Sequence, residues 1–178
     1  ADFTKAYEPD PLLGFSEGGI VGYRLAAQLQ SQIKALVTVG AQWRLSPSDQ
    51  VFAMLRGLTA EMWEGMFPGS RAYYESVNRS ADFSRLVGSA VALWTDLGPA
   101  GYPAGSVKDI TTPTLIVRGD NDLLLSLDEA GAVRSNLPTA SFLNVPFAGH
   151  EVHKDSPRLF LAVIKDFLAD PRTPPVEA

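Results

Sequence analysis

Two short segments of this chain are mostly apolar and rich in β-branched residues. They are residues 33–41 (IKALVTVGA) and 113–118 (PTLIVR). A strand that shows no regular alternation of polar and apolar residues is expected to be buried on both sides, which is typical of a parallel sheet covered by helices. Residues 140–146 (ASFLNVP) predict a third strand, and the short apolar run 11–16 (PLLGFS) predicts another strand that ends at a serine.

Helical patterns lie between these strands, over residues 17–30, 126–137 and 156–169. The second of them begins with Ser126 and has Glu129 three positions later, which is a capping-box pattern. Strands that alternate with helices predict parallel crossovers. The sequence therefore predicts an α/β fold with a mostly parallel sheet, in one domain that extends over residues 1–178.

Residues 42–106 interrupt this alternation. They contain no strand pattern and read as helices over 48–66, 70–78 and 81–97. An ordinary connection in an α/β unit has about 2–6 residues. We therefore expect an inserted helical cap over the carboxyl edge of the sheet.

Composition excludes several classes of protein. The chain has 178 residues, a net charge of −5 and no cysteine. It shows no basic excess for nucleic acid, no thiol for a disulfide or a cysteine nucleophile, and no apolar run near the ~20 residues that cross a membrane. We expect no nucleic-acid or membrane partner, and a cytoplasmic location as the default.

The serine that ends the first strand lies in a Gly-x-Ser-x-Gly pattern. Residues 14–18 read Gly-Phe-Ser-Glu-Gly, between a predicted strand and a predicted helix. A nucleophile elbow needs this context, because the turn exposes the hydroxyl of Ser16 above the sheet and directs the backbone N–H of Glu17 at a developing oxyanion. A glycine-rich turn with a helix-capping serine also fits the pattern.

Acids and a histidine follow the later strands. Asp120 and Asp122 come directly after the 113–118 strand, and His150 follows the 140–146 strand. The acids also suit a turn, and the histidine also suits a helix cap. With His153, His150 forms a His-x-x-His pair, but no cysteine, third histidine or tight acidic cluster accompanies it, so we expect no metal and no cofactor.

The order of these groups is informative. Serine, then acid, then histidine, each just past a strand, is the order found in α/β-hydrolases. Over residues 11–170 the segments GFSEGG, PTLIVRGDND and FAGHEVHKDSPRLF resemble the second half of an α/β-hydrolase-fold protein. The most similar group has a helical cap after the sixth strand and includes esterases, carbon–carbon bond hydrolases and lactonase-like enzymes.

This resemblance implies a catalytic triad of Ser16 as nucleophile, His150 as base and Asp122 as the orienting acid, because the family acid falls in Gly-x-x-Asp. The family's dehalogenases have aspartate at the elbow, so Ser16 argues against dehalogenation. Several strands and a second oxyanion donor normally precede the elbow, and residues 1–13 are too short to supply them. We therefore expect the N-terminal strands to be missing, with an unpaired sheet edge at residues 11–15 that a homodimer or a complementing N-terminal segment covers.

Two functions follow. The first is an esterase-like serine hydrolase that acts on a small-molecule ester or related acyl substrate. The alternative is a non-catalytic scaffold that keeps these residues and binds a partner. The expected cap holds Trp43, Trp63 and Trp94, which predict an apolar acyl pocket. Packing within the cap's own core also accounts for these tryptophans.

Overall fold

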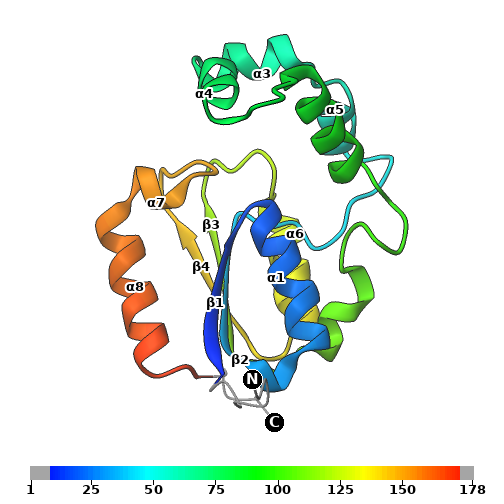
Figure 1. The fold of residues 1–178 in the computed structure, drawn as a ribbon. Coiled ribbons are helices and arrows are strands. Elements are labelled where there is room, and N and C mark those ends of the chain that lie inside the picture. The colour runs from blue at the N-terminus through cyan, green and yellow to red at the C-terminus, as the bar shows by residue number, and fades with distance from the viewer. Residues whose placement is uncertain (1–8, 173–178) are drawn as a thin grey trace, which may run out of the picture. The chain divides into compact units, whose positions relative to one another are not determined.

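The computed structural model describes residues 9–172, which contain one sheet of four parallel strands (Figure 1). The strands are β1 (Asp10–Phe15), β2 (Ile33–Val39), β3 (Thr114–Gly119) and β4 (Ala140–Val145), and they lie in this order across the sheet. All three neighbouring pairs are parallel. The expected α/β class with a parallel sheet is confirmed.

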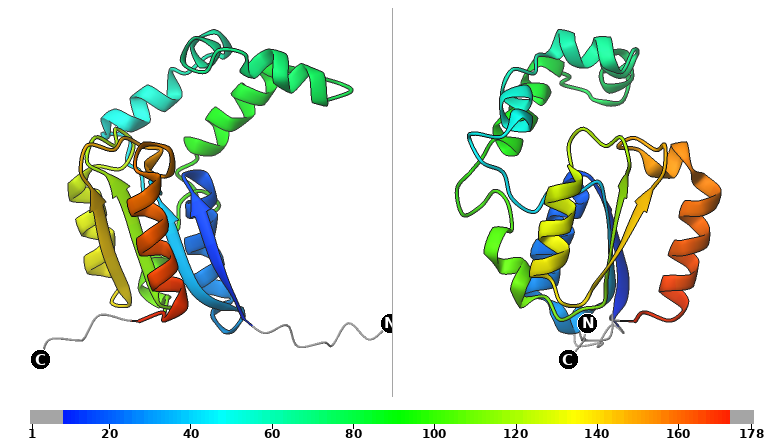
Figure 2. Two further views of the ribbon diagram at one scale, coloured as in Figure 1. Left: turned by 90° about the vertical axis from the view of Figure 1, so that its left-hand side faces the viewer. Right: turned by 180° about the vertical axis from the view of Figure 1, so that it is seen from behind.

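Helices cover both faces of this sheet. Figures 1 and 2 show α1 and α6 on one face and α8 on the other. The elements around the sheet are α1 (Glu17–Gln28), η1 (Gln30–Gln32), η2 (Ala104–Asp109), α6 (Leu127–Asn136), α7 (Val152–Asp155) and α8 (Pro157–Ala169). The three helices predicted around the sheet are therefore present, with ends within two residues of their expected positions.

Alternate side chains of the central strands enter two separate cores. Leu36 and Ile116 belong to the core beneath α1 and α6. Val37 and Val117, the next residue along each strand, belong to the core beneath α8. Both central strands are thus buried on both faces, as their sequence predicts.

A second compact unit contains residues 45–102 and falls within the predicted insertion 42–106. Its helices are α2 (Gln50–Arg56), α3 (Ala60–Met66), α4 (Ser70–Val77) and α5 (Phe83–Trp94), and Figure 2 traces them in turn. The single helix expected over 48–66 is wrong, because the segment forms two helices. The first, α2, ends at Arg56, and the hydroxyl of Thr59 accepts the N–H of Met62 at 3.2 Å and so caps the start of α3. That this unit is a cap stays a prediction.

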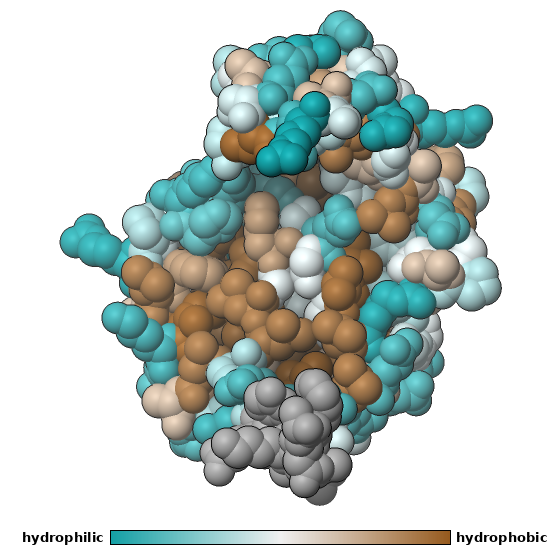
Figure 3. Space-filling model, viewed as in Figure 1, coloured by the Kyte–Doolittle hydropathy of each residue, from teal (hydrophilic) through white to brown (hydrophobic). Residues whose placement is uncertain are grey.

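The first strand lies at an edge of the sheet. Within residues 9–172, β1 pairs with β2 on one side and with no strand on the other. Leu13 in β1 and Val21 in α1 are 48% and 47% exposed, and Figure 3 shows an apolar area over this side of the sheet unit. The unpaired edge expected at residues 11–15 is therefore present in the described part of the chain.

Candidate active site

Ser16 joins β1 to α1 through a sharp turn. Its backbone has φ 52° and ψ −121°, in a left-handed region that few non-glycine residues adopt. Its N–H donates to the carbonyl of Val39 at 2.8 Å, which fixes the turn to the end of β2. A Cβ on Gly14 would lie 2.3 Å from the carbonyl oxygen of Gly18, so only glycine fits at this position. The predicted strand-to-helix turn is therefore present, and it holds the serine in a strained backbone conformation.

Asp122 lies in the loop that leads from β3 to α6. Its side chain is fully buried, and its Oδ1 accepts the N–H groups of Leu124 at 2.9 Å and Leu125 at 3.1 Å. Asp120 has a different role, because its Oδ1 accepts from the Nδ2 of Asn144 at 3.0 Å. The loop therefore directs one of the two candidate acids into the protein and binds the other to β4.

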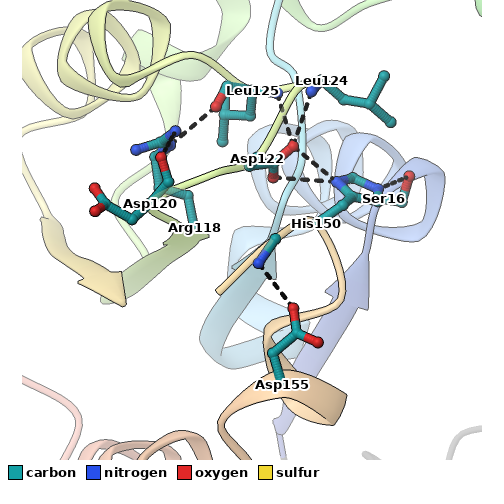
Figure 4. Close-up of polar contacts among 9 residues, drawn as sticks. Ser16, Arg118, Asp120, Asp122, Leu124, Leu125, His150 and Asp155 are labelled. Atoms are coloured by element: carbon teal, nitrogen blue, oxygen red, sulfur yellow. Dashed lines mark hydrogen bonds and ion pairs between the residues drawn. The ribbon is translucent and has the colours of Figure 1, made fainter. Parts of the chain in front are cut away.

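His150 connects the acid to the serine. The Nδ1 of its ring lies 3.0 and 3.1 Å from the two carboxylate oxygens of Asp122, and its Nε2 lies 3.0 Å from the Oγ of Ser16 (Figure 4). A carboxylate beside Nδ1 favours the tautomer with the proton on that atom. Nε2 is then free to accept the serine hydroxyl. The three side chains predicted from the sequence thus lie in one hydrogen-bonded line, with Asp122 rather than Asp120 beside the histidine.

Other residues hold the imidazole in place, and the sequence did not single them out. The ring of Phe15 lies 5.0 Å from that of His150, centroid to centroid. Gly40, at φ 59°, leaves so little room that a Cβ would lie 2.8 Å from the histidine ring and 3.0 Å from Asp122. Asp155 accepts the N–H of Gly149 at 2.7 Å (Figure 4). For Gly40, the one sequence signal was the Gly-Ala pair that ends the 33–41 segment, because a glycine at the end of a strand can mark a close approach of the backbone to other groups.

His153 does not join His150 in a shared site. Its ring packs edge-on against the ring of Phe15, which also contacts His150, at 4.9 Å between centroids. Within the described residues, no three histidine, aspartate or glutamate side chains come together in a way that would hold a metal ion. The role of His153 in this structure is to pack beside the elbow.

The remaining candidates differ in location. Glu17 is the first residue of α1, directly after the serine. Trp63 and Trp94 stack at 5.6 Å between centroids within the helical unit. Trp43 was expected in that insertion, and this placement is wrong: it belongs to the sheet unit, is 5% exposed, and packs in the core beneath α1 and α6. Its indole N–H reaches Glu129 at 2.9 Å, which ties it to α6.

None of the helices in the described part of the chain combines the length and the apolar character needed to cross a membrane.

Three curated relatives are similar to most of this chain. A Bacillus subtilis (strain 168) protein provisionally named 2-succinyl-6-hydroxy-2,4-cyclohexadiene-1-carboxylate synthase is 28% identical over 88% of this chain and 65% of its own length. The sn-1-specific diacylglycerol lipase of Mus musculus is 26% identical over 90% and 59%. The 2-(acetamidomethylene)succinate hydrolase of Mesorhizobium japonicum (strain LMG 29417 / CECT 9101 / MAFF 303099) is 25% identical over 88% and 63%. This chain therefore spans about three fifths of the length of these relatives.

Solved structures agree with the fold. NosK from Streptomyces actuosus has a TM-score of 0.73 at 26% identity, over 92% of this chain and 70% of that one. A meta-cleavage product hydrolase from Pseudomonas fluorescens IP01 has a TM-score of 0.69 at 16% identity, over 92% and 65%. The family model described as alpha/beta hydrolase family matches residues 1–163 of this chain. The protein belongs to the alpha/beta hydrolase family.

Proposed function

We propose that this protein is a serine hydrolase that cleaves an ester or a related acyl substrate. The observation that carries the proposal is the hydrogen-bonded line from the Oγ of Ser16 through His150 to the buried carboxylate of Asp122. This is the arrangement that makes a serine hydroxyl nucleophilic. Relatives named as a hydrolase and a lipase support the same class of chemistry.

The proposed reaction has two halves. Ser16 attacks the substrate carbonyl carbon while its proton passes to the Nε2 of His150, and the backbone N–H of Glu17 faces the oxyanion that forms. The tetrahedral intermediate collapses, the leaving group takes the proton from His150, and an acyl-serine remains. Water then gives a proton to His150 and attacks the acyl carbon, and the second tetrahedral intermediate collapses. This breaks the bond to Ser16 and releases the acid, while His150 returns its proton to the Oγ of Ser16. Throughout, Asp122 holds the imidazole in one tautomer and stabilises it when it is charged.

Turnover of p-nitrophenyl esters with acyl chains of graded length tests this proposal. We expect Ser16→Ala to lower kcat by about 10⁶-fold, the scale seen when a serine nucleophile is removed from a protease. Ser135→Ala is the matched control, because this exposed serine in α6 donates only to the carbonyl of Gly131. Turnover that survives Ser16→Ala contradicts the proposal. A folded protein that turns over no acyl substrate favours the scaffold alternative.

A further inference from the structure

Arg118 carries a buried positive charge that the proposed reaction does not use. It lies near the end of β3, is 3% exposed, and donates only to neutral acceptors. These are the carbonyl of Leu125 at 2.9 Å, the Oδ1 of Asn144 at 2.7 Å and the carbonyl of Asp120 at 3.2 Å. Figure 4 shows Arg118 beside Leu125 and Asp120. Among the described residues it forms no ion pair. A buried charge without a carboxylate partner is costly, and an apolar side chain of similar size would avoid that cost. Stability alone therefore does not account for an arginine here.

The acceptors of Arg118 lead directly to the proposed catalytic acid. The carbonyl of Leu125 accepts from its Nε, and the N–H of the same residue donates to the Oδ1 of Asp122 at 3.1 Å. Both backbone polar groups of Leu125, which is fully buried, are thus fixed. The arginine holds the segment whose N–H groups orient the carboxylate.

Asn144 in β4 forms hydrogen bonds with both Arg118 and Asp120, at the start of the same loop. Its Oδ1 accepts from Arg118, and its Nδ2 donates to the carboxylate of Asp120. The carbonyl of Asp120 accepts from Arg118. The backbone N–H of Asp120 donates to the carbonyl of Val145 at 2.9 Å. The loop that carries Asp122 is therefore fastened to both β3 and β4 before it reaches the histidine.

We propose that Arg118, together with Asn144, is a positioning residue that holds the carboxylate of Asp122 against the Nδ1 of His150. This inference rests on the proposed function. Neither side chain touches the reacting atoms, and each acts through the loop. Because a misplacement of about 1 Å in an active site can cost about 10²-fold in rate, loosening this loop is expected to affect the chemical step rather than substrate binding.

Kinetics of Arg118→Met and Asn144→Leu test the proposal. We expect each variant to lower kcat for an acyl ester by about 10²-fold, with KM changed less than about two-fold. The double variant should lose little more than either single one, because the two side chains act as one unit. The control is Tyr23→Phe, which removes another buried hydrogen bond, from the Oγ1 of Thr38, and should leave kcat unchanged. Fully additive losses, or kcat within two-fold of the parent in both single variants, overturn the proposal.

A second readout does not need activity. The proton between His150 and Asp122 should give a far-downfield ¹H NMR resonance in the parent protein and in Tyr23→Phe, and that resonance should move or vanish in Arg118→Met. If Arg118→Met does not fold, Asn144→Leu makes the same test. A folded variant that keeps the resonance unchanged refutes the positioning role. A parent that shows the resonance but no hydrolysis refutes the proposed function and leaves the positioning role to be decided by the resonance.

Discussion

Gly40 shows how closely the backbone packs around the candidate triad. It follows β2 at φ 59°, and its N–H donates to the carbonyl of Val117 at 2.9 Å. The missing side chain leaves the space that His150 and Asp122 occupy. Both the positive φ and the lack of room therefore require glycine at this position.

We predict that Gly40→Ala lowers hydrolytic kcat by at least about 10²-fold, because the added methyl group pushes the imidazole away from the acid or the serine. Gly18→Ala is the matched control, since a Cβ there has no neighbour within 4 Å and alanine is the better helix former. Steady-state kinetics of both variants make the comparison. Equal kcat values for Gly40→Ala and Gly18→Ala would contradict this prediction, because they would mean that the added methyl group does not disturb His150 enough to slow hydrolysis.

The two aspartates of the 119–122 turn should differ sharply. Asp122→Asn removes the charge beside His150 and favours the wrong tautomer, so we expect kcat to fall by about 10⁴-fold. Asp120→Asn should have a small effect, because an amide oxygen can still accept from Asn144. Turnover of one ester by both variants measures the difference. Similar losses would mean that the acids share the role.

The order of residues in the sequence was enough to predict Ser16, His150 and an acid after the 113–118 strand, because the carboxyl ends of parallel strands share one edge of the sheet. The choice of Asp122 over Asp120 came from the resemblance to the α/β-hydrolase family, in which the acid falls in Gly-x-x-Asp. The contribution of Arg118 could not be predicted in this way. Its partners lie on a loop and a neighbouring strand, and no spacing reveals that its donors converge on Leu125 and Asn144.

At the scale of elements, Glu129 joins the start of α6 to the end of the segment after β2. Its N–H is capped by Ser126 as the sequence predicts, but its carboxylate binds Trp43 and Arg44 instead of returning to the cap. The hydrogen bonds and the charge of Arg44 lower the pKa of Glu129 despite its partial burial. Since the carboxylate partner lies 85 residues away, the sequence pattern could not reveal this contact.

A lowered folded pKa means that Glu129 stabilises the protein above the ordinary glutamate pKa, and that this contribution is lost as pH falls through the folded value. We therefore predict that Glu129→Gln lowers the free energy of unfolding at pH 7 and that the difference from the parent shrinks as the solution is acidified. Urea unfolding across this range measures it. Glu75→Gln, an exposed change in α4, is the control. A difference that grows on acidification would contradict the account.

The helical unit supplies another prediction at this scale. We propose that Trp63 and Trp94 contact the acyl group of the substrate, so that Trp94→Ala raises KM for an aromatic ester more than for an acetyl ester. Tyr73→Ala, at 72% exposure in the same unit, is the control. Parallel changes in KM for both esters would instead assign the tryptophans to packing alone.

At the scale of the whole molecule, the main feature is the outer side of β1, which pairs with no strand among residues 9–172. An edge strand with exposed apolar side chains invites pairing with another chain. We propose that this 178-residue chain forms a homodimer through β1 or binds a complementing N-terminal segment there. Light scattering should find a mass above the 19.2 kDa monomer, and Leu13→Lys should reduce it. Met62→Lys, at similar exposure in the helical unit, should not. A monodisperse, folded 19.2 kDa monomer would contradict this proposal.

Covalent labelling with a fluorophosphonate probe tests the central claim most directly, because only an activated serine reacts rapidly with it. Intact mass spectrometry should find one adduct for each chain, and peptide mapping should locate it on Ser16. The adduct should be absent in Ser16→Ala and form far more slowly in His150→Ala. A folded parent protein that stays unlabelled, or that carries the adduct on another serine, would contradict the assignment of Ser16 as the nucleophile.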